Sequence, residues 1–228
     1  MADEYTGRDN LEVMALAANY NRYLTDAVSD WSRGMKRLVD FGAGCGTFAV
    51  MQQRPGRELI CVETDAVLQS QLRAKGLEVI DSLERADDAS IDGIYSLNVL
   101  EHIENDTAVI RMWSAKLKAG GSAFVYVPAF MVLYSSMDKK VGHVRRYTRQ
   151  ELERKFREQG FTVTESRYAD SLGFFAALVY KWLDNGKGDI NPRMLRIYDQ
   201  WVFPLSRLLD TVFCRVLGKN VLITLVKN

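Results

Sequence analysis

The chain has 228 residues, 47% hydrophobic and 26% charged, which is ordinary for a globular domain with a sizeable core. Its formal net charge of +1 disfavours a nucleic-acid partner, because no basic excess is present to neutralise phosphates. The three cysteines form no CxxC pair and the N-terminus is polar and acidic, so we expect a reduced cytoplasmic protein without a signal or transit peptide.

The N-terminal segment 11–31 repeats apolar residues at steps of three and four, which predicts an amphipathic helix. Tyr20 lies within this helix beside two asparagines. It belongs either to a plain helix surface or to a cover over a bound cofactor. On the second interpretation, residues 1–34 form an N-terminal helical lid.

Strands and helices then alternate as far as residue 128. Apolar runs predict strands at 35–41, 58–63, 77–80, 91–97 and 122–128, with helices up to about residue 53, at 65–76 and at 106–118. This alternation implies parallel βαβ units and a doubly wound α/β sheet with helices on both faces.

The stretch Leu38–Phe48 passes from a strand carrying Asp40 directly into Gly42, Gly44 and Gly46. Glycines allow a positive φ and a close approach of a ligand to the backbone, as adenosine-type cofactors require. The spacing departs from G-x-G-x-x-G, and no Gly-Lys-Ser/Thr follows as in a phosphate-binding loop. An acid at the strand end suits a ligand with an ammonium group and a sulfonium better than a pyrophosphate.

Further polar residues follow the other predicted strands, and the ends of parallel strands meet at one sheet edge. Glu63 ends the second strand, where a carboxylate can accept both ribose hydroxyls. Asp81 and Ser82 follow the third strand and suit an exocyclic amine such as adenine N6. The fourth strand continues into residues 98–102, NVLEH.

Taken in order, VDFGAGCGTF, Glu63, the Asp81-Ser82 pair, SLNVLEHI and LKAGGSAFVYVP resemble the motif series of class I S-adenosylmethionine-dependent methyltransferases. The resemblance covers residues 35–128, the expected cofactor-binding core of a single domain, 1–228. It implies a Rossmann-like seven-stranded sheet of order 3-2-1-4-5-7-6 with strand 7 antiparallel. It also implies S-adenosyl-L-methionine as donor, with S-adenosyl-L-homocysteine as product. The expected donor-binding residues are Asp40, Gly42, Ala43, Gly44, Gly46, Glu63, Thr64, Asp81, Ser82, Leu97 and Asn98.

A second, narrower resemblance lies in DKKVGHVRRYTRQEL, residues 138–152, and in the C-terminal GKNVLITLVKN. It is to a bacterial branch with a Gly-His-x-Arg-Arg-Tyr loop after strand five, often associated with glycosyltransferases and envelope or polyprenyl-linked sugar pathways. We expect a small-molecule acceptor to meet Tyr20, Tyr134, His143, Arg145, Arg146 and Tyr147.

His143 is the candidate catalytic base, since imidazole is a base near neutral pH. Arg145 and Arg146 suit an acidic acceptor, because guanidinium pairs bidentately with carboxylate or phosphate. The alternative is that these three residues join the loop to carboxylates at the strand ends. For His102 a helix-capping or packing role is expected, and no His/Cys/carboxylate cluster has metal-ligand spacing, so no metal is predicted.

The remaining segment, 129–228, is interpreted as acceptor loop, helical cap and last strands. A capping box predicts a helix at 148–159, and strands are expected at 161–169 and 221–227. Apolar helical segments at 172–180 and 193–217 are too short or too interrupted to span a membrane. Residues 171–217 therefore form a pocket roof, a lipid-like acceptor cap, a peripheral contact with the inner face of the membrane, or a homodimer surface.

The sequence thus predicts methyl transfer to a small molecule, with oxygen mildly preferred because a histidine is available and no Asn/Asp-Pro-Pro-Tyr-like amide clamp follows strand four. The acceptor is acidic, sugar-linked or lipid-linked in this interpretation. Two alternatives stay open. One is an NAD(P)-dependent oxidoreductase on the same type of fold, and the other is a non-catalytic donor-binding or membrane-associated subunit.

Overall fold

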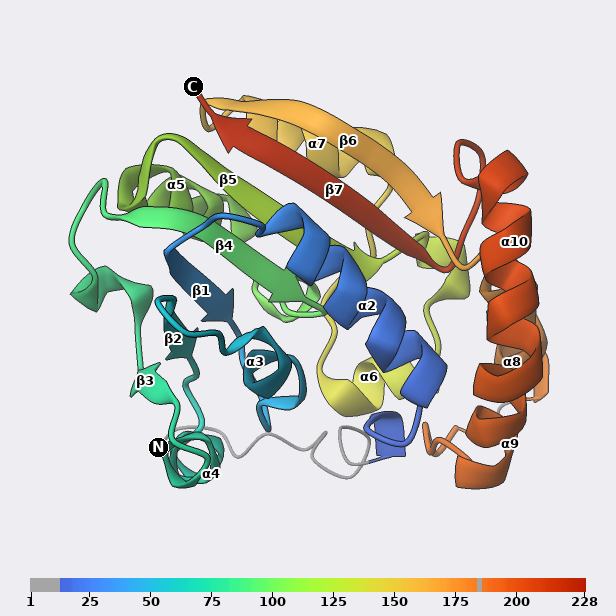
Figure 1. The fold of residues 1–228 in the computed structure, drawn as a ribbon. Helices are drawn as coiled ribbons and strands as arrows, with labels where there is room; N and C mark the ends of the chain where they lie inside the picture. Colours follow the sequence, from blue (N-terminus) through green and yellow to red (C-terminus); the bar gives the residue numbers. More distant parts are fainter. Residues whose placement is uncertain (1–12, 184–185) are drawn as a thin grey trace.

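The structure is a computed structural model that describes residues 13–183 and 186–228. Within these residues the chain builds a seven-stranded sheet of order β3-β2-β1-β4-β5-β7-β6 (Figure 1). The strands are β1 Arg37–Phe41, β2 Glu58–Val62, β3 Glu78–Ile80, β4 Ile91–Leu97, β5 Leu117–Pro128, β6 Phe161–Ala169 and β7 Asn220–Lys227. The α-helices are α2 Ala18–Trp31, α3 Thr47–Gln52, α4 Ala66–Ala74, α5 Asp106–Lys116, α6 Ser136–Val141, α7 Arg149–Arg157, α8 Ser171–Leu183, α9 Pro192–Ile197 and α10 Phe203–Phe213.

Strands β1 to β5 are parallel to one another, because each is followed by a helical crossover that returns the chain to the same edge. The C-terminal strand β7 inserts between β5 and β6 and runs antiparallel to both. This confirms the predicted Rossmann-like order with an antiparallel seventh strand. All parallel strands consequently end at one edge, where the glycine loop lies.

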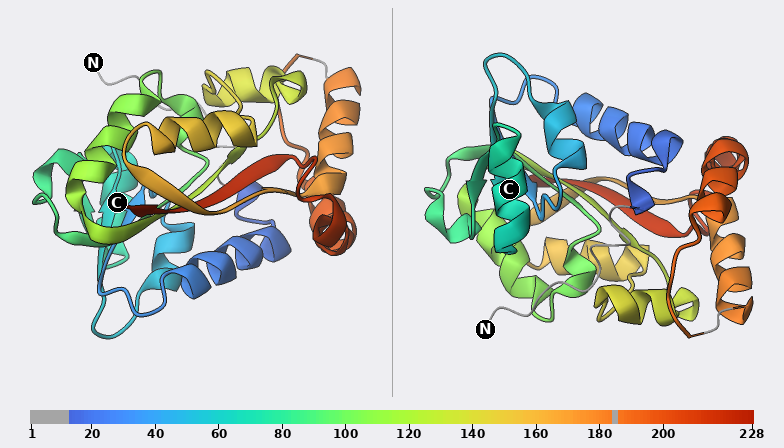
Figure 2. Two further views of the ribbon diagram at one scale, coloured as in Figure 1. Left: turned by 90° about the horizontal axis from the view of Figure 1, so that it is seen from above. Right: turned by 90° about the horizontal axis from the view of Figure 1, so that it is seen from below.

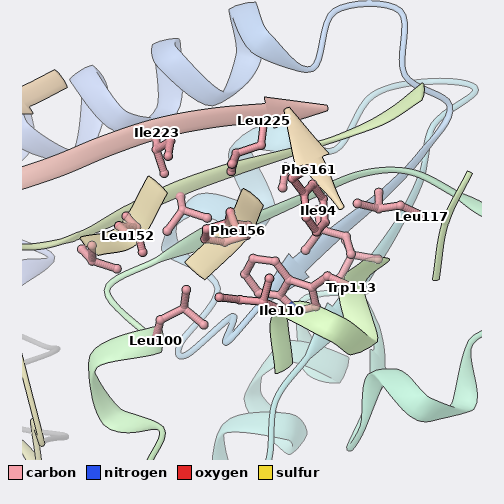
Figure 3. Close-up of a cluster of buried hydrophobic side chains, with 14 of the residues drawn as sticks. Ile94, Leu100, Ile110, Trp113, Leu117, Leu152, Phe156, Phe161, Ile223 and Leu225 are labelled. Atoms are coloured by element: carbon pink, nitrogen blue, oxygen red, sulfur yellow. The ribbon is translucent and has the colours of Figure 1, made fainter. Parts of the chain in front are cut away.

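Helices cover both faces of the sheet, as the βαβ pattern predicts (Figure 2). On one face Trp113 of α5 and Phe156 of α7 pack against Ile94 and Leu225 of the sheet, and Figure 3 shows this cluster. On the other face Leu24 and the rest of the α2 stripe pack with residues from α3 and α4. Two apolar layers bury most of β1, β4, β7 and the second half of β5, which fixes the strand-end loops on a rigid base.

The helices α8 and α10 pack on each other at one end of the sheet, beyond the layers formed by the other helices (Figure 2). The buried carboxylate of Asp199, in the turn Tyr198–Val202 before α10, connects the C-terminal helices to the N-terminal helix α2. Asp199 accepts hydrogen bonds from the backbone N–H groups of Asn19 and Tyr20 at 3.0 and 2.9 Å, and so satisfies the first turn of α2. The described part of the predicted lid is therefore held by the C-terminal helices.

Some predicted boundaries are wrong. The helix expected over 193–217 is divided into α9, a π-helical turn at Tyr198–Val202 and α10, whose first turn tolerates Pro204 because no N–H is needed there. The segment 129–147 contains a 3₁₀ turn, Met131–Leu133, and α6. The helix predicted at 106–118 ends at Lys116, and β5 begins at Leu117 rather than at residue 122. Residues 11 and 12 of the predicted first helix lie outside the described residues, and α2 begins at Ala18.

Candidate active site

The glycine loop follows β1 and adopts a conformation that only glycine takes without strain. Gly42, Gly44 and Gly46 have φ values of 81°, 55° and 81°. A Cβ on Gly42 would lie 2.4 Å from Cγ2 of Val99, whereas a Cβ on Gly44 would meet nothing within 4 Å. Gly42 is therefore needed for packing against the end of β4, and Gly44 exposes its backbone to open space.

Glu63 at the end of β2 holds this loop in place. Its Oε2 accepts a hydrogen bond from the backbone N–H of Gly44 at 2.8 Å, and its Oε1 accepts one from Asp65 at 2.9 Å. Each carboxylate oxygen keeps a further acceptor lone pair. The acid predicted for the ribose thus touches the loop predicted for the rest of the donor.

Asp40 lies beneath the loop and is 3% exposed. Burial, with a smaller contribution from the charge of Glu63, outweighs the lowering effect of the Tyr95 hydroxyl and raises the pKa of Asp40 to about 7. Its Oδ2 has no hydrogen-bond partner among the described residues. A buried acid with an unused oxygen is a site for a ligand that brings a cationic or hydrogen-donating group.

The remaining predicted donor residues lie along the same edge. Asp81 is half exposed and pairs with Arg85 at 2.6 Å, and the Ser82 hydroxyl accepts from the Glu84 N–H at 3.2 Å. Ala43 is buried and Thr64 is exposed, both next to the loop, and Leu97 is the last residue of β4.

Asn98 continues the chain from β4 with a φ of 56°. Its backbone N–H donates to the Tyr126 carbonyl at 2.8 Å, and its Nδ2 donates to the Tyr20 hydroxyl at 3.4 Å. Tyr20 in turn packs edge-on against Phe203, with ring centroids 5.5 Å apart. The structure thus brings Tyr20 of the predicted lid onto the end of β4.

The loop 129–147 is organised by Asp138, a buried carboxylate that the sequence did not single out. Asp138 accepts hydrogen bonds from His143 Nδ1 at 2.7 Å, from Arg146 Nε at 2.9 Å and Nη2 at 3.0 Å, and from the Ser135 N–H at 2.8 Å. Burial acts to raise the pKa of Asp138, but the bonds to His143 and Arg146 outweigh it and lower that pKa to about 2. Asp138 is therefore ionised and orients both side chains.

Arg146 and Tyr147 lie inside the protein, with exposed fractions of 4% and 0%. The Arg146 guanidinium binds Asp138, and the Tyr147 hydroxyl lies 2.8 Å from Asp106 Oδ2. Arg145 also binds Asp106, at 3.1 Å. These contacts favour the loop-anchoring alternative for Arg145 and Arg146 over contact with an acceptor, and they give Tyr147 an anchoring role as well.

Tyr134 and His143 remain at the surface of the loop. The Tyr134 hydroxyl donates to the His143 carbonyl at 2.7 Å, which fixes the backbone there. Because ionised Asp138 accepts from Nδ1, the His143 lone pair is on Nε2. Nε2 lies 3.7 Å from Oε1 of Glu101, and the rings of His143 and His102 are 4.6 Å apart. One side chain of the predicted acceptor loop therefore meets the end of β4.

Glu101, His102 and His143 have ligand-type atoms within 4.8 Å of one another, close enough for a metal ion. The sequence argument against metal-ligand spacing missed this cluster, because the ligands come from segments far apart in the chain. The sequence contains only two histidines, and both belong to this cluster, which is the one sequence feature that could have indicated it. Two surface hollows of about 500 and 430 Å³ lie at the opposite edge, near Asp92 and Glu58, and contain none of the predicted site residues.

Comparison with known proteins agrees with this geometry. A family model described as "Methyltransferase domain" matches residues 14–166, more than half of the chain. Ubiquinone biosynthesis O-methyltransferase of Xanthomonas oryzae pv. oryzae (strain PXO99A) is 27% identical over an alignment of 99 residues, which covers 39% of this chain and 41% of that protein. The match to this curated relative thus spans about two fifths of the relative's length.

Solved structures share the whole fold at low identity. A SAM-dependent methyltransferase of Thermotoga maritima, titled a possible histamine N-methyltransferase, has a TM-score of 0.65 at 16% identity and covers 96% of this chain and 95% of its own. A putative methyltransferase in complex with the Haloferax volcanii Trm112 activator has a TM-score of 0.65 at 15% identity and covers 100% and 99%.

The chain belongs to this methyltransferase family and is a class I S-adenosylmethionine-dependent enzyme. The residues fit the donor: open space faces Gly44, Glu63 keeps lone pairs for hydroxyls, and Asp40 has an unpartnered buried oxygen. When bound, S-adenosylmethionine supplies an electrophilic methyl group on a sulfonium. The oxidoreductase and the non-catalytic subunit are thereby set aside. No helix in the described part of the chain is long and apolar enough to cross a membrane.

Proposed function

We propose that the enzyme methylates an oxygen atom of a small-molecule acceptor that carries an apolar part, and that His143 activates the acceptor hydroxyl. The observation that carries this proposal is the Asp138–His143 pair, which aims the Nε2 lone pair at the edge where β4 ends. The limited similarity to ubiquinone biosynthesis O-methyltransferases supports an oxygen acceptor.

The chain's own residues would act mainly by positioning. Asp40, Glu63 and the glycine loop hold the donor at the sheet edge, while Tyr20 and Asn98 meet beside it. Asp138 holds the Nδ1 atom of His143, and the Tyr134 hydroxyl holds the backbone carbonyl of His143. Two fixed partners limit the motion of the imidazole, as activation of one defined hydroxyl requires.

We infer that the acceptor has an apolar part because the C-terminal helices expose many large apolar side chains. Large apolar side chains on α8, α9 and α10 and on the turn between α9 and α10 face outward. They are Phe175, Val179, Trp182, Leu183, Met194, Ile197, Trp201, Leu205, Leu208 and Val212. So many exposed large apolar side chains on helices that pack together are typical of a membrane or ligand contact rather than of a solvated surface.

The charges around this face favour an anionic lipid surface on the cytoplasmic side. In α9, α10 and the turn between them (residues 192–213), Arg193, Arg196 and Arg207 are exposed, whereas the acids Asp199 and Asp210 are buried and bound to backbone N–H groups. The exposed charge of the segment is therefore positive, as in helices that lie on membranes. We propose that this face binds the membrane peripherally and receives a lipid-linked acceptor.

The test of the proposed function uses S-adenosylmethionine with a tritiated methyl group and a panel of phenols, prenylated hydroquinones, sugars and amines. His143→Ala should lower turnover by about 10²–10⁴ on the accepted hydroxyl compound. Val144→Ala, an exposed neighbour, is the control and should turn over like wild type. Titration with S-adenosylhomocysteine should give unchanged donor affinity in both variants. Methylation of amines alone, or an unchanged His143→Ala, would contradict the proposal.

The membrane contact is tested by sedimentation with vesicles of phosphatidylglycerol and, separately, of phosphatidylcholine. Wild type should sediment with the anionic vesicles, and Trp201→Ser should lose most of that binding. Val67→Ser removes an exposed apolar residue on α4 and serves as the control. A concentration-dependent dimer that Trp201→Ser dissolves, without vesicle binding, would assign the face to a homodimer.

A further inference from the structure

The cluster Glu101, His102 and His143 contains an unusual carboxylate. Glu101 is 0% exposed, and neither of its carboxylate oxygens has a hydrogen-bond partner among the described residues. The nearby Arg146 guanidinium is already bound to Asp138 and to the Ala129 carbonyl. A buried carboxylate without partners is costly unless it binds a proton or a cation.

The two imidazoles beside Glu101 are arranged as metal ligands are. His143 donates from Nδ1 to Asp138 and turns Nε2 toward Glu101 Oε1, 3.7 Å away. The His102 ring interacts with the backbone of Val141 and Gly142. Histidines that bind metals commonly donate their other N–H to a carboxylate or a backbone carbonyl, which fixes the ring.

The spacing of the three side chains also suits a cation. The three ligand atoms lie within 4.8 Å of one another. Zn–N and Zn–O distances in proteins are about 2.0–2.2 Å, so the three ligand atoms would need to move roughly 1 Å closer to one another to bind the same zinc ion.

We propose that Glu101, His102 and His143 bind one divalent transition-metal ion of the zinc type. Two nitrogens and one carboxylate suit Zn²⁺ or Co²⁺ better than Mg²⁺, which prefers oxygen ligands and retains water. The 11% exposure of the His143 side chain provides access from solvent. Three protein ligands leave one position open, as in catalytic rather than structural sites.

The open position has a use in the reaction, and this step rests on the proposed function. An ion held by these residues would lie beside the 3₁₀ turn Leu100–His102 that follows β4, the edge to which the proposed function assigns the acceptor hydroxyl. A cation lowers the pKa of a hydroxyl placed beside it. The hydroxyl proton passes to solvent, the oxygen bonds to the methyl carbon, and the carbon–sulfur bond of the donor breaks to leave neutral S-adenosylhomocysteine. In this site Nε2 of His143 binds the ion, so His143 activates the acceptor through the ion and does not itself accept the hydroxyl proton.

The experiment titrates Co²⁺ into the full chain after treatment with EDTA and dialysis, and follows the visible absorption of the bound ion. Wild type should bind one equivalent with the intense bands of a four-coordinate site. Glu101→Gln keeps the side-chain volume but loses the charge, and should weaken binding at least about 100-fold, more than loss of an outer-shell partner does. Glu104→Gln, an exposed acid in the same turn, is the control and should bind like wild type.

Two further measurements keep the outcomes separate. Circular dichroism of each variant checks that it is folded, and a second variant, His102→Gln, should show the same loss of Co²⁺ as Glu101→Gln. Absence of a visible Co²⁺ complex in wild type, or equal binding by all variants, overturns the metal site. Methyl transfer by the chelated protein together with absent Co²⁺ binding would leave the proposed function intact and remove the metal. Stoichiometric Co²⁺ binding without methylation of any acceptor would support the metal site and contradict the proposed function.

Discussion

Removal of one buried hydroxyl, in Tyr147→Phe, tests whether this residue anchors the acceptor loop or contacts the acceptor. The hydroxyl lies 2.8 Å from Asp106 Oδ2 and 3.0 Å from the Leu100 carbonyl, and its single proton goes to the carboxylate, the stronger acceptor. Asp106 keeps Arg145 and Lys155, at 3.1 and 2.9 Å, so the variant leaves no orphaned charge.

The expected loss is therefore that of one hydrogen bond to a charged group, about 1.5–3 kcal/mol in the free energy of unfolding. For a chain of this size, each kcal/mol shifts the melting temperature by about 2–4 °C. Urea unfolding followed by circular dichroism measures the first quantity, and a thermal melt checks the second. Affinity for S-adenosylhomocysteine and turnover should stay within about twofold of wild type, because Tyr147 is fully buried.

Tyr134→Phe is the matched control, because its hydroxyl donates to a neutral backbone carbonyl of His143 at 2.7 Å. It should cost less, about 0.5–1.5 kcal/mol. A Tyr147→Phe protein as stable as wild type but much slower in methyl transfer would refute the reasoning. It would place this hydroxyl at the acceptor.

Three further predictions follow from other contacts. Asp199→Ala removes the acceptor for two N–H groups at the start of α2 and should lower the free energy of unfolding by about 1–2 kcal/mol in urea denaturation. An unchanged free energy of unfolding would show that Asp199 does not stabilise α2. Gly42→Ala should destabilise through both its φ of 81° and the 2.4 Å approach to Val99, and Gly42→Ala/Val99→Ala should recover part of that loss in thermal melts; equal losses in both proteins would contradict the packing argument. Because burial raises the pKa of Asp40 from 3.8 to about 7, the donor-free wild type loses the stability linked to the protonated acid as pH rises through this range, so Asp40→Asn should gain stability relative to wild type. Affinity of the wild type for S-adenosylmethionine should rise with pH near 7, and a flat profile like that of Asp40→Asn would dissociate Asp40 from the donor.

The sequence predicted that the glycine loop and Glu63 lie together at one sheet edge, because this arrangement is fixed by local rules. A strand that ends in Asp40 and continues into alternating glycines forms a loop at the sheet edge, and Glu63 ends the neighbouring strand. Parallel strands bring these residues together whatever the rest of the chain does.

The acceptor side was less predictable, because its contacts are long-range and aperiodic. Nothing in the local pattern tells that Arg146 and Tyr147 point inward, since their partners Asp138 and Asp106 are 8 and 41 residues away. The capping of α2 by Asp199 spans 179 residues. Such contacts follow from the tertiary fold rather than from periodicity, so the sequence did not predict the orientation of the side chains in the loop 129–147.

The most direct test of the central claim is isothermal titration of the wild-type protein with S-adenosylmethionine and with NADH, repeated on Gly44→Val. The open space beside Gly44 and the unpartnered oxygen of Asp40 predict saturable binding of S-adenosylmethionine, no binding of NADH, and loss of donor binding in Gly44→Val. Saturable NADH binding without any response to S-adenosylmethionine would contradict the assignment of this sheet edge to a methyl donor.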